Sequence, residues 1–362
     1  MSGIDRTTIE QALSNWVDPD LERDLVSADC VRDIRVDGGR VAVDLMYGLP
    51  MDREREERAR AVREHLERLA GVERVEVAID WQIAAGEVRS QAQRIEGVAN
   101  IIAVASAKGG VGKSTTAANL ALGLRVEGAR VGVLDADIYG PSQPRMLGIE
   151  GKPASPDGQN IVPMERYGIQ AMSIGFLVDP ESPMIWRGPM VTKALEQMLY
   201  NTQWRELDYL VVDLPPGTGD IQLTLVQKVP LSGAVIVTTP QDIALLDARK
   251  GLKMFEQVST PVFGIVENMS MHVCSHCGHA EPIFGEGGGA QMAADHGVRL
   301  LGQLPLDPSI REQADSGQPS VIAAPDSEVA RLYREVARRT GAAQALAGKL
   351  PSGFPNIRIV GD

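Results

Sequence analysis

The sequence predicts an α/β protein whose larger part is a mostly parallel sheet flanked by helices, preceded by a small N-terminal α/β domain. A glycine-rich loop at 108–115 follows an apolar, β-branched run at 101–106 and precedes a stretch with helical spacing at 116–124. From residue 99 onward, short apolar runs alternate with helical patterns, as they do in parallel sheets covered by helices. We therefore expect a small domain at 1–82, a polar linker at 83–98 and a larger domain at 99–362.

Composition limits the classes of partner. The 362 residues carry a net charge of −12, and 44% of them are hydrophobic, which is enough for about two or three domains with sizeable cores. Because an acidic chain has no overall basic field, we expect neither nucleic acid nor an anionic membrane as a partner. No apolar leader follows Met1, no apolar run is long enough to cross a bilayer, and three cysteines are too few for a disulfide framework. The expected location is therefore the reducing cytoplasm.

The small domain is expected to run in the order helix, strand, strand, helix, strand, with one further short helix after its first turn. The two adjacent strands are joined by the hairpin turn Asp37-Gly38-Gly39, and the last helix is densely charged but has one apolar face. One helix is expected to begin at 7–10 and another at 18–21, and the charged helix is expected to cover 51–70. The expected strands cover 34–36, 40–45 and 72–79.

Six strands are expected in the larger domain, each of them a short apolar run. They cover 101–106, 130–135, 208–213, 233–238, 262–266 and 299–303, and a C-terminal helix follows at 327–339. Ligands of open α/β sheets gather at the carboxyl ends of the strands. Polar residues that directly follow these strands are therefore candidates for a binding site.

The glycine loop has the composition of a phosphate cradle. Gly109, Gly110 and Gly112 allow backbone conformations that a side chain would block, so successive N–H groups can turn onto phosphate oxygens. Lys113 would reach the β- and γ-phosphates of ATP, and the Ser114 hydroxyl is placed for Mg²⁺. Strand, loop and helix follow in the order that this chemistry needs, which disfavours a plain turn. The expected nucleotide contacts in the loop are Gly109, Gly110, Val111, Gly112, Lys113, Ser114 and Thr115.

Polar side chains follow three of the expected strands. Asp135 and Asp137 could order the waters of Mg²⁺, hold an attacking water, or form an ordinary solvated pair. Asp213 ends an apolar strand, a pattern typical of a carboxylate that holds Mg²⁺ through water. Asn268 carries an amide that suits the donor and acceptor edge of adenine, so we favour base recognition over a plain turn.

Cys274 and Cys277 form the second chemical centre. A Cys-x-x-Cys pair can be a redox centre, half of a zinc site or part of an iron–sulfur site. A redox pair is expected at a helix N-terminus, whereas this pair lies in a stretch rich in glycine, serine and histidine. His276 and His279 leave a zinc site open. A [4Fe–4S] cluster takes four ligands, so one chain could supply half of them and a two-fold dimer all four.

The glycine loop resembles a known signature. Its sequence, K-G-G-V-G-K-S-T, matches the deviant Walker A pattern of P-loop NTPases of the SIMIBI/MinD-like class, although Ala107 stands where a glycine is usual. In those ATPases the extra lysine crosses a dimer interface to the partner's nucleotide. The resemblance implies a homodimer in which Lys108, Lys113 and Asp137 are catalytic, with Asp137 orienting the hydrolytic water and Asp135 supporting the metal site.

Further motifs resemble those of the Mrp/ApbC/NBP35 family of iron–sulfur carrier ATPases. They occur in the family's order at 186–190, 214–222, 238–241, 267–270, 274–278 and 283–289. The N-terminal unit resembles the MIP18-like domain of iron–sulfur assembly factors. These resemblances imply slow ATP hydrolysis and a [4Fe–4S] cluster bridged between two subunits by Cys274 and Cys277. They also imply transfer of the cluster to apo-proteins, with scaffold proteins as further partners.

Cys30 is not expected to bind the cluster. Some MIP18-like domains carry a cysteine in the loop after their second strand, but here that loop, 47–51, contains none. Cys30 stands earlier in the chain, where a cysteine is usually a small buried hydrophobe.

Two other functions remain open at this point. A MinD/ParA-type positioning ATPase would share the glycine loop, but it needs an amphipathic membrane-binding tail or a DNA-binding surface, and the tail here has little basic charge. A reductase like the nitrogenase iron protein would also bridge a cluster, but it takes its cysteines from two separated positions. The adjacent pair therefore favours the carrier.

Overall fold

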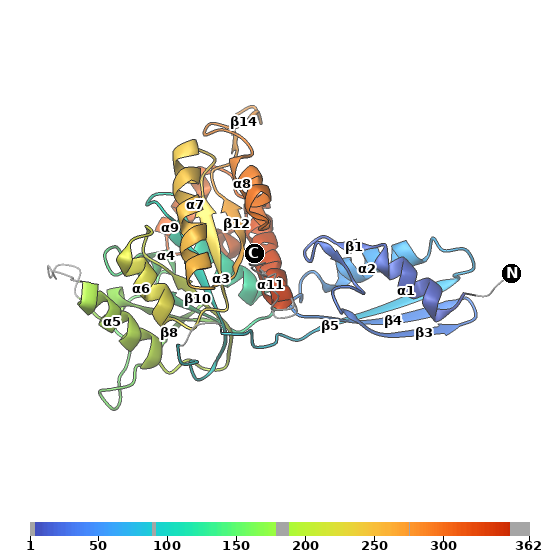
Figure 1. Cartoon of the computed structure of the whole chain (residues 1–362), viewed down its shortest axis with the longest axis horizontal. Coiled ribbons are helices and arrows are strands. Elements are labelled where there is room, and N and C mark those ends of the chain that lie inside the picture. Colours follow the sequence, from blue (N-terminus) through green and yellow to red (C-terminus); the bar gives the residue numbers. More distant parts are fainter. Residues whose placement is uncertain (1–3, 89–91, 179–187, 275, 348–362) are drawn as a thin grey trace, which may run out of the picture.

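A computed structural model of the chain describes residues 4–88, 92–178, 188–274 and 276–347 (Figure 1). It consists of a small N-terminal α/β unit, drawn in blue, and a larger unit built on one wide sheet. Helix α11 (Glu328–Ala347) belongs to the larger unit and also packs against the small one. None of the described helices is long and apolar enough to cross a membrane.

The small unit is a three-stranded sheet with two helices. β3 (Val31–Asp37) pairs antiparallel with β4 (Arg40–Tyr47), and β4 pairs parallel with β5 (Arg74–Trp81) after the crossover helix α2 (Arg55–Leu66). Alternate residues of β4 are buried, as in a sheet with one covered face. These elements and the first helix, α1 (Arg6–Ser14), agree with the expectations from the sequence.

The short helix expected to begin at 18–21 is not formed, so that prediction was wrong. The Asp18 carboxylate accepts hydrogen bonds from the N–H groups of Asp20 and Leu21, both at 2.9 Å, and this closes a tight turn. The chain then returns, so that β1 (Val17–Asp18) pairs with β2 (Arg23–Asp24) in a two-residue ladder. A side chain that bonds nearby N–H groups competes with a helix, and here it prevents one.

The larger unit contains an eight-stranded sheet in the order β15-β12-β11-β6-β10-β7-β9-β8. The neighbouring strands run parallel, except that β8 pairs antiparallel with β9 at one edge. The strands are β6 (Val98–Ala105), β7 (Val131–Asp135), β8 (Met164–Arg166), β9 (Ile169–Ser173), β10 (Leu207–Asp213), β11 (Gly233–Thr238), β12 (Val262–Glu267) and β15 (Leu300–Gln303). The six expected strands are confirmed. β8 and β9 were missed because both are short and joined by a tight turn at Tyr167 and Gly168, which have φ values of 54° and 74°.

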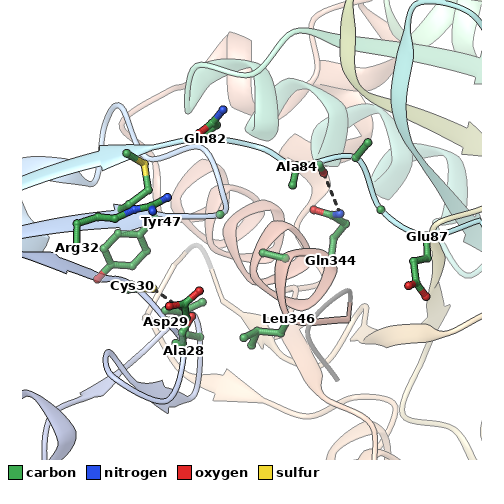
Figure 2. Close-up of a pocket in the computed structure, with 16 residues that line it drawn as sticks. Ala28, Asp29, Cys30, Arg32, Tyr47, Gln82, Ala84, Glu87, Gln344 and Leu346 are labelled. Carbon is green, nitrogen blue, oxygen red and sulfur yellow. Dashed lines mark hydrogen bonds between the residues drawn. The ribbon is translucent and has the colours of Figure 1, made fainter. Parts of the chain in front are cut away.

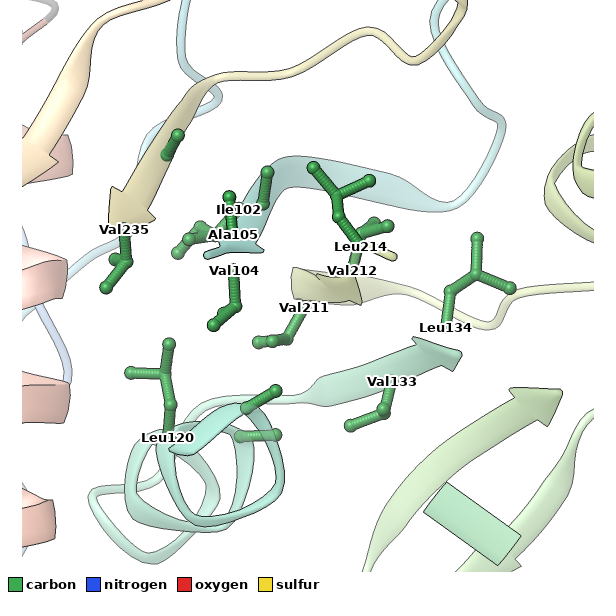
Figure 3. Packing of buried hydrophobic residues seen from close by; sticks show 14 of the residues in the cluster. Ile102, Val104, Ala105, Leu120, Val133, Leu134, Val211, Val212, Leu214 and Val235 are labelled. Atoms are coloured by element: carbon green, nitrogen blue, oxygen red, sulfur yellow. The ribbon is translucent and has the colours of Figure 1, made fainter. Parts of the chain in front are cut away.

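Helices flank this sheet, and a short hairpin projects from it (Figure 1). The hairpin consists of β13 (His272–Val273) and β14 (Ala280–Glu281). The helices are α3 (Lys113–Val126), α4 (Gln143–Met146), η1 (Ile174–Phe176), α5 (Gly188–Tyr200), α6 (Asp220–Lys228), α7 (Asp242–Gln257), α8 (Gly288–His296), α9 (Pro308–Asp315), α10 (Ser320–Ala323) and α11. In the core, Val104, Val133 and Val211 from three strands face Leu120 of α3 (Figure 3).

Helix α11 packs closely on α3 and is longer than expected. A Cβ atom at Gly123 would lie 2.8 Å from the Cβ of Ala337, so the two helices approach as closely as they do only because residue 123 is glycine. The sequence predicted that the helix ends near 339, but it continues to Ala347 because Ala342 and Leu346 are buried in the core of the small unit. The last turns of the helix are therefore stabilised by contacts with the N-terminal part of the chain.

A buried network of charges joins the two units. Arg338 on α11 donates hydrogen bonds to Asp20 of the small unit and to Glu127 at the end of α3, both at 3.0 Å. Arg58 on α2 donates to Asp20 at 2.6 Å and also to Asp18. All five side chains are more than nine-tenths buried. Burial raises the pKa of Glu127, and the Arg338 guanidinium opposes that shift.

A cavity of about 450 Å³ lies between the small unit and α11 (Figure 2). Cys30, Tyr47 and Leu346 contribute to its wall, and Gln344 of α11 donates a hydrogen bond across to the carbonyl of Ala84 at 3.5 Å. Cys30 is only 3% exposed, in agreement with its expected place as a buried hydrophobe.

Replacing Asp20 with Ala should destabilise the protein strongly, because Arg58 and Arg338 would each lose a partner in a buried position. Loss of one member of such a buried pair costs about 3–5 kcal/mol, to be measured as the free energy of unfolding in urea. The matched control is Asp33→Ala, since Asp33 pairs with Arg35 at the surface at 2.9 Å and should contribute less than about 1 kcal/mol. Equal losses in the two variants would contradict a structural role for the buried network.

Candidate functional site

The glycine loop connects the end of β6 to the first residue of α3. Gly110 and Gly112 have φ values of 83° and 84°, a left-handed conformation that favours glycine. A Cβ atom at residue 112 would also lie 2.2 Å from the side-chain nitrogen of Asn268. The backbone geometry of the loop thus depends on its glycines, as the sequence predicts for a phosphate cradle.

Lys113 brings the loop together with two of the expected carboxylates. Its ammonium is buried and pairs with Asp213 at the end of β10. The Asp137 carboxylate lies 3.9 Å from the same ammonium. The Lys113 ammonium also donates a hydrogen bond to the Ser114 hydroxyl at 3.2 Å. Burial raises the pKa of Asp137, and Lys113 opposes this shift. The structure therefore places a cation, two carboxylates and a hydroxyl at one point.

Asp135 is fully buried beneath this point. Its carboxylate accepts hydrogen bonds at 3.0 Å from the N–H groups of Ser142 and Gln143 and from the Ser173 hydroxyl. Burial, together with the nearby Asp213 carboxylate, raises the pKa of Asp135 to about 7. All three bonds go to one carboxylate oxygen, and the other oxygen accepts the backbone N–H of Asp137 at 3.2 Å. Asp135 therefore holds the chain that follows β7 and so positions Asp137.

Gln143 is a site residue that the sequence analysis missed. Its side-chain NH₂ group donates to Asp213 at 2.9 Å and to the backbone carbonyl of Ser114 at 3.0 Å. It therefore ties the carboxylate at the end of β10 to the start of α3. Gln143 lies on the four-residue helix α4, which has no strand end or glycine signature, and its nearness to Asp137 in the chain was the only available signal.

Asn268 follows β12 and faces the glycine loop from the other side. Its side-chain NH₂ group donates to the carbonyl of Val111 at 2.9 Å, and its backbone N–H donates to Thr238 at 2.7 Å. The expected adenine-recognition residue thus lies beside the phosphate cradle. Its position supports that role, which stays a prediction.

The two cysteines lie at the tip of the β13–β14 hairpin. The backbone N–H of Cys274 donates to His279 at 2.9 Å, and Cys277 is exposed to solvent. Hydrogen bonds from the backbone of Cys277 and of His276 lower the pKa of the Cys274 thiol, which favours its thiolate form. Among the described residues, Cys274 and Cys277 are not in the first turn of any helix, so the arrangement typical of a redox pair is absent there.

The histidines near the cysteines do not complete a metal site within the described part of one chain. Over those residues, no group of three or more histidine, cysteine, aspartate or glutamate side chains lies close enough together to hold a metal ion. His276 and His279 are both exposed. A Cys₂His₂ zinc site is therefore not preformed in the described residues of a single chain.

The fold and the converging residues define a P-loop nucleoside triphosphatase. A family model described as "NUBPL iron-transfer P-loop NTPase" matches residues 97–340, and one described as "Iron-sulfur cluster assembly protein" matches residues 6–79. The chain belongs to the NUBPL iron-transfer P-loop NTPase family.

Relatives match nearly the whole chain. An iron-sulfur cluster carrier protein of Escherichia coli (strain K12) is 48% identical over 361 residues, which cover 98% of this chain and 96% of that protein. A protein of the same name from Pseudomonas fragi is 59% identical over 275 residues, covering 75% of this chain and 96% of that protein. A solved nucleotide-binding protein from Archaeoglobus fulgidus, in complex with ADP, is 40% identical with a TM-score of 0.56 and covers 62% of this chain and 89% of that one.

Two substitutions should separate nucleotide binding from hydrolysis. Lys113→Ala removes the cation of the cradle and should weaken ATP binding about ten- to a hundredfold. Asp137→Ala leaves the cradle intact, so Mg·ATP should still bind, while hydrolysis falls about a hundredfold or more. Calorimetric titration with ATP and phosphate release measure the two effects. If both variants lost ATP affinity equally, Asp137 would have no separate role in placing the attacking water.

Proposed function

We propose that the protein hydrolyses ATP and carries a [4Fe–4S] cluster bridged between two copies of the chain, which it passes to apo-proteins. The observation that carries this proposal is the hairpin with Cys274 and Cys277. It presents two thiols, one of them exposed, and it continues directly from the strand end that bears Asn268. Because a cluster of this type takes four ligands, two copies of the hairpin meet that number.

The nucleotide site has the donors that Mg·ATP requires. The backbone N–H groups of the glycine loop and the Lys113 ammonium would hold the phosphates. The Ser114 hydroxyl is an oxygen ligand of the kind that Mg²⁺ prefers, and the Asp213 carboxylate would hold the ion through water. Mg²⁺, when bound, neutralises charge that develops on the β- and γ-phosphates. Two carboxylates lie beside Lys113, and the hydrogen bond from the Gln143 side chain goes to Asp213. Asp137 is the other one, and it would orient the attacking water.

Exposed apolar side chains support a homodimer that covers the hairpin. Ile243 and Leu246 lie one turn apart on α7 and are 66% and 56% exposed, and Val273 and Ile283 near the cysteines are 54% and 51% exposed. Apolar residues gathered on an exposed face mark an interaction surface. Lys108 is also exposed, at the edge of the glycine loop, so a partner subunit could meet its ammonium directly.

The family assignment favours the carrier over the positioning ATPase. Relatives that match nearly the whole chain are named iron-sulfur cluster carrier proteins, and they extend through the N-terminal unit. We further propose the cytoplasm as the location and a division into a small domain at 1–82, a linker at 83–98 and an ATPase domain at 99–362. Cys274 and Cys277 are free thiols, which suit a reducing compartment and so support the location.

Loss of either hairpin cysteine should abolish cluster binding. After anaerobic reconstitution with iron and sulfide, Cys274→Ala and Cys277→Ala should hold no iron above background, because each dimer would keep only two of the four thiolates. Iron and sulfide analysis and absorption spectra measure this. Cys30→Ala is the matched control and should keep the full cluster, since Cys30 is buried in the small unit. Binding of zinc alone by the wild-type protein would contradict the carrier function.

A mixed dimer should show whether Lys108 acts across the interface. In a heterodimer of a Lys108→Ala subunit with an Asp137→Ala subunit, the Lys108→Ala subunit keeps its own Asp137. If the lysine acts in trans, this site receives Lys108 from its partner, and the heterodimer should regain about half of the wild-type ATPase rate. Each homodimer should be nearly inactive. A heterodimer that stays inactive, although its subunits fold and exchange, would place Lys108 in cis.

A further inference from the structure

The Lys113 ammonium lies among the oxygens that a metal ion in the nucleotide site would use. It pairs with the Asp213 carboxylate, donates to the Ser114 hydroxyl at 3.2 Å and lies 3.9 Å from the Asp137 carboxylate. Ser114 and Asp213 are the residues proposed to hold Mg²⁺, the first directly and the second through water. The structure thus shows one positive group at the centre of the proposed cation site.

Lys113 supplies the positive charge that balances the two carboxylates. Among the residues that the structure describes, no other basic side chain forms an ion pair with Asp213 or Asp137. Asp213 is fully buried, and Lys113 is only 6% exposed. Charges interact more strongly in such a place than in water, because the surroundings screen them less. A divalent ion that approached these carboxylates would therefore be repelled by the ammonium.

Phosphates of a nucleotide offer the ammonium a different partner. In a P-loop the lysine reaches the β- and γ-phosphates. Lys113 is the first residue of α3, and its flexible four-carbon stem allows the ammonium to move while the backbone stays in the helix. Asp213 stays in place during this exchange, because its second oxygen accepts a hydrogen bond from the Gln143 side chain at 2.9 Å.

We propose that Lys113 is the resident cation of the Mg²⁺ site until a nucleotide binds, so that the protein takes up a divalent ion only together with the nucleotide or after it. On binding of ATP, the ammonium exchanges the Asp213 carboxylate for phosphate oxygens. The carboxylate is then available to waters of Mg²⁺, and the phosphates add the oxygen ligands that this ion prefers. The inference rests on the proposed ATP site, to which it adds an order of binding.

The same exclusion has a consequence for iron. Ser114, Asp137 and Asp213 offer only oxygen atoms, and a site of this kind generally binds Fe²⁺ more tightly than Mn²⁺. In a protein that also handles iron, free Fe²⁺ would compete with Mg²⁺ for such a site. Because the ammonium occupies the site until ATP arrives, free iron is directed away from it.

The test uses the full chain and Mn²⁺ as the probe, with the free ion measured by electron paramagnetic resonance. Without nucleotide, Lys113→Ala should bind one Mn²⁺ per chain about tenfold more tightly than the wild-type protein or better, because two buried carboxylates have lost their counter-charge. In the double variant Lys113→Ala/Asp213→Asn this gain should disappear. In the wild-type protein, a non-hydrolysable ATP analogue should tighten Mn²⁺ binding about fivefold or more.

Two control variants separate the ammonium from other features of the site. Lys108→Ala removes an exposed ammonium from the same loop, so it changes the net charge as Lys113→Ala does. Gln143→Ala frees the second oxygen of Asp213 but keeps the Lys113 ammonium. Without nucleotide, both variants should bind Mn²⁺ as weakly as the wild-type protein.

Either of two results would overturn the proposal. One is Mn²⁺ binding to the wild-type protein that is as tight without the analogue as with it and is lost in Asp213→Asn, a comparison that does not depend on the folding of Lys113→Ala. The other is a Lys113→Ala protein with the wild-type circular dichroism spectrum and no gain in Mn²⁺ affinity.

Failure of the proposed function gives different results. If the nucleotide site itself were wrong, the wild-type protein would not bind the analogue and Mn²⁺ together, and the order of binding would be refuted with it. If only the carrier function were wrong, iron would be absent after reconstitution, while all of the Mn²⁺ measurements would stay as expected.

Discussion

The buried ion pair between Lys113 and Asp213 is the contact on which the nucleotide site depends. It joins the first residue of α3 to the last residue of β10, and β10 lies between β6, which leads into the glycine loop, and β7, which leads to Asp137. Asp213 stands opposite Asp135 in the parallel register. The ends of three neighbouring strands therefore converge on one ammonium group, and the order of the strands in the sheet decides which side chains surround it.

Features that depend on a few consecutive residues could be predicted from the sequence. The six expected strands, the glycine loop, Lys113 and Asp213 all carry local signals, namely an apolar run, a glycine pattern or a charge at a strand end. Of the features that were missed, one depends on distant residues and another is a local turn. Gln143 is a site residue because Asp213 and Ser114 lie next to it in space, and the turn at Asp18 replaces a helix because that carboxylate captures two N–H groups. No window of the sequence contains both partners of the Arg338–Asp20 pair.

Several buried carboxylates lie at contacts between separate structural elements of this molecule. Asp20 and Glu127 lie where the small unit meets α3 and α11, Asp135 lies where β7 turns toward the nucleotide site, and Glu267 lies between β12 and α8. Each accepts hydrogen bonds from donors on another part of the chain. Such groups add little net stability compared with apolar contacts, but their directional bonds allow only one arrangement of the elements that they connect. The relative placement of the two units and of the hairpin is thus specified by a few polar contacts.

The path of α11 has a consequence for the order of events during synthesis. The small unit is made first, but its core is completed by Ala342 and Leu346, which are translated about 260 residues after the end of β5. At typical rates of elongation this delay is roughly ten to fifty seconds. Throughout that time the nascent N-terminal part has an apolar gap that no later residue has yet filled. Its final core therefore waits for the C-terminal helix, and until then the unfinished unit exposes apolar surface of the kind that makes folding intermediates prone to aggregation.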